Sequence, residues 1–170
     1  MPLPVAVGRD RAERMTMILK QKPIKLTGTD KYGVRTQFGA LPWRLKAGKV
    51  QILLITSRGS GRWIIPKGWP MHGQTPSEAA ATEAYEEAGI EGKLSPMVLG
   101  FYGYRKRRVK GEQDLPVMVT VFPLQVKKLH KTWPEKRERK RTWVSRKKAA
   151  RLIGEPELAQ MIRQFDPRRQ

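Results

Sequence analysis

The feature of this chain that most constrains its fold is a continuous block that predicts a strand, a loop and a capped helix. Residues 62–68 read Arg-Trp-Ile-Ile-Pro-Lys-Gly, a short apolar strand that runs into a turn. Thr75 is placed as a helix N-cap, with Pro76 as the first helical residue and Glu78 at the third position, as in a capping box. Gly89 is placed to end the helix.

The predicted helix carries three glutamates on one face near its C-terminal end. Glu83, Glu86 and Glu87 are spaced i, i+3 and i+4, so their side chains lie close together and repel one another. One interpretation is a solvated acidic face with no specific role. The other is a metal site, because carboxylates are the ligands that hard divalent cations prefer. The flanking strand and loop favour the metal site.

The block resembles the Nudix box, whose family pattern is G-x5-E-x7-R-E-U-x-E-E-x-G-U, where U is a bulky apolar residue. The positions that match are Gly68, Glu83, Ala84, Glu86, Glu87, Gly89 and Ile90. The segment 61–68 also resembles the lead-in that many Nudix hydrolases carry. A box of this length and order is much more specific than an isolated glycine-rich loop.

Two positions depart from the family pattern. Gln74 stands where the family has its first glutamate, and Thr82 stands where the family has an arginine that helps to orient the carboxylates. Gln74 keeps the shape of glutamate but brings no charge to a metal. Thr82 can offer one neutral hydrogen bond, which is weaker than a charge-assisted one. The departures predict reduced or differently tuned activity and leave a catalytically silent relative as an alternative.

The resemblance implies an α/β fold, a Nudix-type α/β/α sandwich around a mixed, partly parallel sheet. It also implies that Glu83, Glu86 and Glu87 are the catalytic residues and that they hold Mg²⁺, or alternatively Mn²⁺, together with Gly68. Divalent ions in such a site bridge the oxygens of a diphosphate and activate a water molecule for attack. The implied reaction is hydrolysis of a phosphoric anhydride.

Residues 37–165 further resemble the diphosphoinositol polyphosphate phosphohydrolase branch of the family, which also cleaves diadenosine polyphosphates. This resemblance rests on residues 66–68, 86–89 and 133–144. It implies a substrate that is a highly phosphorylated small molecule, which arginine and lysine side chains would bind. The predicted substrate contacts are Lys67, Arg44, Arg58, Arg62 and Arg105. Family members often use a further carboxylate from outside the box, and its candidates are Glu112, Asp114 and Glu138.

The formal net charge of +20 is extreme, and its basic clusters lie at residues 105–108, 127–128, 139–141 and 146–148. A surface of this charge attracts polyanions, but charge does not choose among a small phosphorylated molecule, a nucleic acid and an acidic surface. Two alternatives therefore stay open. One is an RNA- or ribosome-binding module on a Nudix scaffold, and the other is an enzyme that removes pyrophosphate from the 5′ end of RNA.

The length of 170 residues suits one domain with a sizeable core. We expect a basic N-terminal extension over residues 1–32, with a short helix over 11–21, and a Nudix domain over 33–166. The chain has no cysteine, which excludes disulfides and thiolate metal sites. No apolar run is long enough to span a bilayer, so we expect no membrane association and a cytoplasmic location. The oligomeric state is left open.

The other expected elements follow from apolar periodicity. Strands are expected over residues 34–45, 50–57, 94–105, 115–126 and 142–144, with a hairpin turn at 47–49. Helices are expected after Ser145 to residue 152 and over residues 155–165. The expected core residues are Leu53, Ile55, Ile65, Val119 and Val121.

Overall fold

The computed structural model describes residues 35–169. The expected extension over residues 1–32, its helix over 11–21 and the boundary at residue 33 lie outside the described residues and stay predictions. The elements are β1 (Arg35–Lys46), β2 (Lys49–Thr56), β3 (Trp63–Ile64), β4 (Lys67–Gly68), α2 (Pro76–Ala88), β5 (Ile90–Leu94), β6 (Gly100–Lys106), β7 (Leu115–Leu129), β8 (Arg141–Ser145), α3 (Arg146–Leu152), α4 (Pro156–Gln164) and the 3₁₀ turn η1 (Pro167–Arg169).

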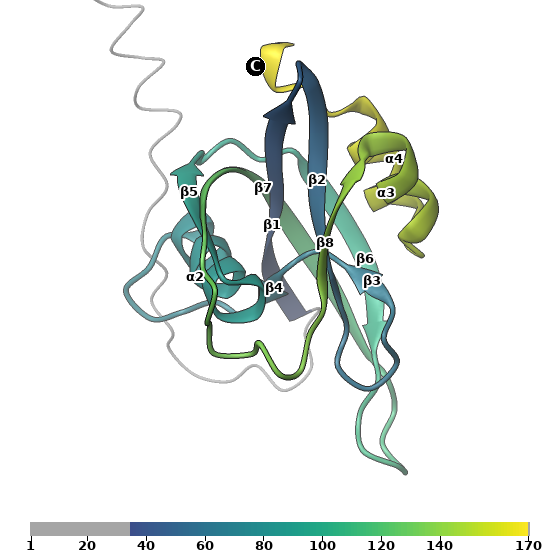
Figure 1. Ribbon diagram of the computed structural model, residues 1–170. Helices are drawn as coiled ribbons and strands as arrows, with labels where there is room; N and C mark the ends of the chain where they lie inside the picture. The colour runs from purple at the N-terminus through teal and green to yellow at the C-terminus, as the bar shows by residue number, and fades with distance from the viewer. Residues whose placement is uncertain (1–34, 170) are drawn as a thin grey trace, which may run out of the picture.

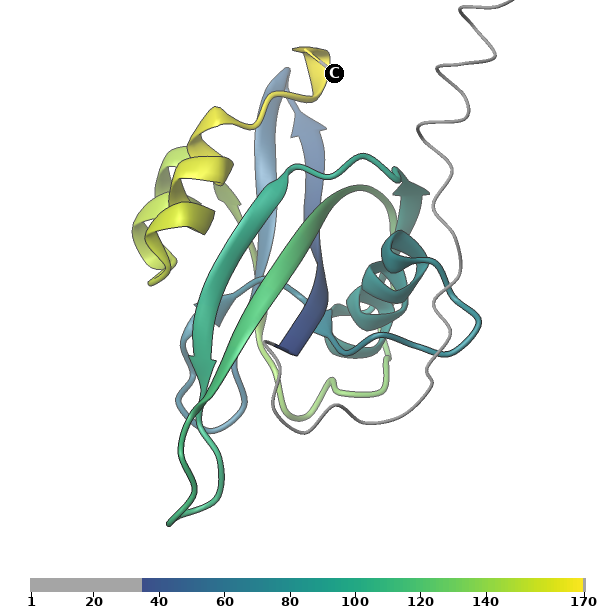
Figure 2. The same ribbon diagram turned by 180° about the vertical axis from the view of Figure 1, so that it is seen from behind.

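The strands form one mixed sheet, as the sequence predicts. Its central path runs β3-β2-β1-β7-β5, with β4 paired to β1, β6 to β7 and β8 to β2. The two long strands β1 and β7 are parallel, and the other pairings in the sheet of residues 35–169 are antiparallel. Figure 1 shows β1, β2 and β7 at the centre, and Figure 2 shows the same arrangement from behind.

Helices cover both faces of the sheet, which confirms the α/β/α sandwich. Helix α2 packs on one face, while α3 and α4 pack together on the other (Figure 1). Successive residues of β2 supply the two cores alternately, because side chains alternate across a strand. Leu53 and Ile55 lie under α2, whereas Ile52 and Leu54 lie under α3 and α4. The expected core residues are all at most 1% exposed.

Helix α2 begins and ends where the sequence predicts. The Thr75 side chain accepts a hydrogen bond from the Glu78 backbone, and the Glu78 carboxylate accepts one from the Thr75 backbone at 2.9 Å. This is the expected capping box. Gly89 ends the helix in the left-handed conformation, with φ of 64°. The alanines of the helix face the sheet, where four of them are fully buried.

The expected strand over residues 94–105 is wrong in its first half. The structure has β5 ending at Leu94 and β6 beginning at Gly100. Pro96 lies between them, and proline cannot donate to a strand ladder. Strands β5 and β6 pair antiparallel with successive parts of β7, residues 124–129 and 115–121, and residues 95–99 between them belong to neither strand. Strands β6 and β7 pair with each other, and β7 runs on to Leu129, beyond its expected end at residue 126.

The turn between β1 and β2 is the expected one, with Ala47 and Gly48 both at positive φ. Among the described residues, no helix is both long and apolar enough to cross a bilayer. At the other end of the sheet, the end of β2 lies close to the start of β1 and to the β6–β7 hairpin. This end carries the cavity that forms the candidate site.

Candidate active site

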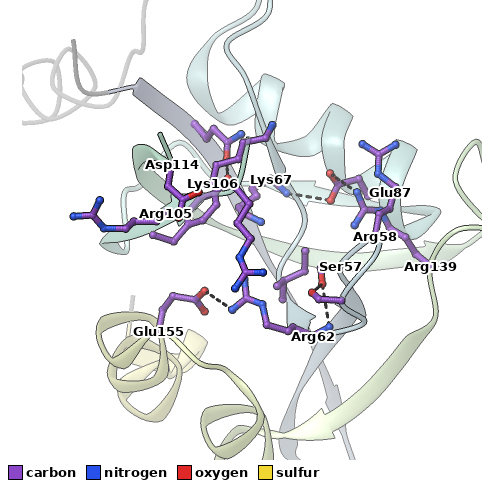
Figure 3. A pocket seen from close by; sticks show the side chains of 15 residues that line it. Ser57, Arg58, Arg62, Lys67, Glu87, Arg105, Lys106, Asp114, Arg139 and Glu155 are labelled. Atoms are coloured by element: carbon purple, nitrogen blue, oxygen red, sulfur yellow. Dashed lines mark hydrogen bonds and ion pairs between the residues drawn. The ribbon is translucent and has the colours of Figure 1, made fainter. Parts of the chain in front are cut away.

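A cavity of about 840 Å³ opens at the end of β2. Seven basic and three acidic side chains line it, so its charge strongly favours an anionic ligand. The basic residues are Arg58, Arg62, Lys67, Arg105, Lys106, Arg107 and Arg139, and the acidic ones are Glu87, Asp114 and Glu155. Figure 3 shows them converging from the β2–β3 loop, β4, α2, the β6–β7 hairpin, the loop before β8 and the start of α4.

Glu87 connects α2 to this cavity. It is only 8% exposed. Arg139 approaches its Oε1 atom with Nη2 at 3.2 Å, and the backbone nitrogen of Lys67 donates to Oε2 at 3.3 Å (Figure 3). The carboxylate is therefore held between the loop before β8 and the strand that precedes the box loop. A buried carboxylate held in this way is typical of a functional site.

Burial, with repulsion from neighbouring carboxylates, raises the pKa of two of the box glutamates. Burial, followed by repulsion from Glu87, Glu86 and Glu135, raises the pKa of Glu83 to about 8. Burial raises the pKa of Glu87 to about 7, against the opposing effect of Arg139 and Lys67. Both groups therefore resist carrying their negative charge in the metal-free protein.

Gly68 is required by the position of Glu83. A Cβ atom added at residue 68 would overlap the carboxylate group of Glu83, from Oε1 to Cγ. Any other residue there would have to push the glutamate away. The glycine at the start of the box thus lets the strand backbone lie directly against the first matched glutamate of the helix.

The three box glutamates do not form a ready-made metal cage. Among residues 35–169, no three His, Cys, Asp or Glu side chains group closely enough to hold a metal ion. Glu87 faces Arg139, Glu83 lies against Gly68, and Glu86 is exposed. The donor set nevertheless fits a divalent cation, because its atoms are hard oxygens. A cation would also offset the burial of Glu83 and its repulsion from neighbouring carboxylates, which together raise its pKa.

Four of the five predicted substrate contacts line the cavity: Lys67, Arg58, Arg62 and Arg105. Lys67 is partly buried, and burial lowers its pKa while Glu87 and Glu155 raise it. Its ammonium group lies 4.8 Å from the Tyr104 ring centre. Arg44 is not brought to the cavity. It donates to Gln51 at 2.8 Å and stacks over Trp143 instead.

The predicted extra carboxylates fall in different places. Asp114 lines the cavity. Glu112 is exposed and lies 3.8 Å from Arg108 in the β6–β7 hairpin. Glu138 is exposed and lies 3.4 Å from Arg58. A fourth carboxylate, Glu135, was not among the sequence-based candidates. Its charge contributes, after burial, to the raised pKa of Glu83 and of Glu87.

Arg139 is the other important residue that the sequence did not single out. It is 9% exposed. Besides Glu87, it donates to Glu135 at 2.9 Å and to the Thr56 carbonyl at 3.1 Å. In the sequence it belongs to one of several basic clusters, so a run of positive charge was the only local indication that Arg139 has a role. Its role depends on long-range contacts that no local pattern contains.

The loop between β7 and β8 holds the C-terminal end of α2. Trp133 donates its indole hydrogen to the Glu87 carbonyl at 3.2 Å, and the backbone of Glu135 donates to the Glu86 carbonyl at 3.1 Å. Arg141 donates to the Ala88 carbonyl at 2.7 Å and stacks 4.0 Å from the Trp133 ring. These contacts satisfy carbonyls that every helix end leaves without partners, and they fix the position of Glu87.

Comparison with known proteins agrees with this geometry. The family model described as NUDIX domain matches residues 35–165. The chain is 29% identical over 158 residues to "Nudix hydrolase 21, chloroplastic" of Arabidopsis thaliana, covering 91% of this chain and 77% of the relative. It is 31% identical over 137 residues to "Diphosphoinositol polyphosphate phosphohydrolase 3-alpha" of Mus musculus, covering 79% of each chain.

Solved structures show the same fold. The Ap4A hydrolase of C. elegans has a TM-score of 0.52 at 21% identity, covering 78% of this chain and 96% of that one. The MutT protein of Methanosarcina mazei Go1 has a TM-score of 0.56 at 22% identity, covering 84% and 99%. The family match spans the glutamate-bearing helix, the basic cavity and the loop that joins them. The chain therefore belongs to the Nudix hydrolase family, whose enzymes act on phosphoric anhydride bonds.

Proposed function

We propose that this protein is a Mg²⁺-dependent pyrophosphohydrolase that cleaves a diphosphate linkage in a polyphosphorylated small molecule, of the dinucleoside polyphosphate or diphosphoinositol polyphosphate type. The observation that carries the proposal is the contact between the buried Glu87 and a cavity lined by seven basic side chains. The names of the relatives and structural neighbours point to the same two substrate types.

In this proposal the box glutamates bind the metal ion, and basic residues of the cavity bind the substrate phosphates. A divalent ion, when bound by Glu83, Glu86 and Glu87 with Gly68, supplies charge neutralisation and a more acidic water. Mn²⁺ is the alternative ion. Lys67, Arg58 and Arg105 bind the phosphates beside Glu87, and arginine forks fix their orientation. Arg139 keeps the Glu87 carboxylate aimed at the cavity. Catalysis would rest on positioning and charge stabilisation.

The test is a substrate panel assayed with Mg²⁺ on the wild-type protein and on Glu87→Gln. We expect phosphate release from at least one phosphoric anhydride, and a loss of at least about 100-fold in kcat for the variant. Glu157→Gln is a matched control, because Glu157 is exposed on α4 and does not line the cavity. Equal turnover by Glu87→Gln, or no turnover of any anhydride by the wild type, would contradict the proposal.

An RNA 5′ pyrophosphohydrolase, or an RNA-binding module with weak activity, is the second candidate. The net charge of +20 and the basic residues Arg107, Arg108 and Lys110 of the projecting β6–β7 hairpin favour it (Figure 1). The same panel therefore includes a 5′-triphosphorylated RNA oligonucleotide. Steeply salt-dependent RNA affinity that is unaffected by Glu86→Gln and Glu87→Gln would support binding over catalysis. A cytoplasmic location stays a prediction, since named relatives are chloroplastic or mitochondrial.

A further inference from the structure

Glu155 is one of three acidic side chains in a cavity that seven basic side chains also line. It precedes α4 as its N-cap residue, and its side chain is 12% exposed. It lines the cavity across from Glu87 (Figure 3). A partly buried carboxylate repels phosphate groups that approach it. The wall of the cavity at Glu155 therefore disfavours phosphate groups.

Glu155 also neutralises the nearest arginine. The Arg62 guanidinium lies 3.3 Å from the Glu155 carboxylate, and the Arg62 backbone donates to the Ser57 hydroxyl at 3.0 Å (Figure 3). Arg62 was predicted to bind substrate phosphate. In the structure it is held by a carboxylate, so a phosphate at this position would have to compete with Glu155.

The negative charge of Glu155 acts on another group that lines the cavity, because it contributes, after burial, to the raised pKa of Tyr104. Four of the residues that line the cavity are uncharged and carry a hydroxyl or an amide group: Gln37, Ser57, Ser60 and Tyr104. Ser57 and Ser60 lie 2.7 Å apart, and Tyr104 donates to the Gln37 side chain at 2.6 Å. Such uncharged donors and acceptors can form hydrogen bonds with hydroxyl groups of a ligand.

We propose that Glu155 is a specificity-determining residue that keeps phosphate groups away from the Arg62 wall of the cavity. The cavity then favours a linear polyphosphate joined to a hydroxyl-bearing group, such as a dinucleoside polyphosphate, over a ring that carries phosphates on all sides. This inference rests on the proposed function and selects one of its two substrate types. Specificity of this kind is set by repulsion of the wrong ligand as well as by attraction of the right one.

The first experiment measures the ratio of kcat/KM for diadenosine tetraphosphate to that for a diphosphoinositol polyphosphate. We expect the wild type to have the higher kcat/KM for diadenosine tetraphosphate. Glu155→Gln should lower the ratio about tenfold, in favour of the diphosphoinositol polyphosphate. Glu155→Lys should shift it further. Glu157→Gln, on the exposed first turn of the same helix, should leave the ratio unchanged. Glu155 makes no side-chain cap hydrogen bond, so its replacement does not remove a helix cap.

The second experiment is independent of catalysis. Calorimetry measures the affinity for inositol hexakisphosphate, which has no anhydride bond, and we expect binding by Glu155→Gln to be about tenfold tighter than by the wild type. An unchanged affinity and an unchanged substrate ratio, or a wild type that prefers the ring, would overturn the inference. A wild type that cleaves no anhydride would instead overturn the proposed function, while tighter binding by the variant would still support the role of Glu155.

Discussion

Thr82 donates a hydrogen bond to the side-chain oxygen of Gln74 at 3.1 Å. These are the two positions at which the box departs from its family pattern, and the structure places them in contact. A glutamate and an arginine at the same positions would be opposite charges within reach of each other. The two departures are therefore one change, in which a neutral hydrogen bond stands where the family pattern puts two charges, and the glutamates at 83, 86 and 87 are left in place.

The first prediction concerns this neutral pair. Thr82→Ala removes the hydroxyl, which lies 3.1 Å from both Gln74 and the Glu78 carbonyl. We expect the free energy of unfolding to fall by about 1 kcal/mol, the usual net value of a neutral hydrogen bond, with kcat changed by less than about twofold. Urea unfolding and steady-state kinetics measure the two effects. A large loss of kcat at full stability would show that Thr82 takes part in catalysis.

The second prediction concerns the position of Glu87. Arg139→Gln removes the guanidinium that approaches Glu87 at 3.2 Å. We expect kcat to fall about 10- to 100-fold, as for other residues that orient metal ligands, with a smaller change in KM. Arg139→Lys keeps the charge but loses the fork, so its kcat should lie between the two.

The control for Arg139 is Arg137→Gln, which removes an exposed arginine from the same loop that does not line the cavity. Its kcat should match the wild type. A rise in KM for Arg139→Gln with kcat unchanged would mean that this arginine binds substrate directly rather than positioning Glu87. Thermal unfolding of each variant ensures that the assay temperature lies below its transition.

The third prediction concerns Gly68. Gly68→Ala places a methyl group where the Glu83 carboxylate lies, so the glutamate must move. We expect kcat/KM to fall at least about tenfold, equivalent to about 1.4 kcal/mol of transition-state stabilisation. Gly103→Ala in β6 is the matched control, because its nearest neighbour would be a backbone oxygen at 3.8 Å. Wild-type activity in Gly68→Ala would show that the contact with Glu83 is not needed.

The fourth prediction is the pH dependence of stability without metal. The pKa of Glu83 is about 8 in the folded protein, against an ordinary value of 4.5. Between these values the folded state binds more protons than the unfolded state, so stability falls as pH rises from about 4.5 to about 8. The melting temperature in chelator should therefore decrease across this window.

Glu83→Gln should reduce that decrease without abolishing it, because the pKa of Glu87 is also raised, to about 7. Added Mg²⁺ should stabilise the wild type more at pH 8 than at pH 5.5, since ligands must be deprotonated to bind a cation. Glu157→Gln provides the comparison with an exposed carboxylate. A melting temperature that does not depend on pH from 5 to 8, or that responds equally to Mg²⁺ at both values, would contradict the prediction.

Local signals in the sequence were sufficient for the helix that carries the glutamates. The capping box at Thr75, the end at Gly89 and the burial of Leu53 and Ile55 each depend on residues close in the chain, and each is confirmed. The α/β/α arrangement followed from the family resemblance. By contrast, the split between β5 and β6 depends on which half of β7 each strand pairs with, which periodicity does not reveal.

The sequence could not predict where the cavity lies relative to the strands, and therefore which residues of a strand line it. Arg44 lies on β1, the strand that also supplies Gln37 to the cavity. Seven residues along a strand correspond to about 23 Å, so one end of β1 reaches the cavity and the other does not. Sequence patterns also could not predict the roles of Glu135, Arg139 and Glu155, because each role depends on partners far away in the chain.

The loop that closes the C-terminal end of α2 also determines how this part of the protein can open. Trp133 and Arg141 bond to the carbonyls of the last turn of the helix, so that turn cannot fray while the loop stays in place. The helix end and the loop should therefore unfold locally as one cooperative unit. In hydrogen exchange, the amides of both segments would then share a single opening free energy, above that of the exposed β6–β7 hairpin.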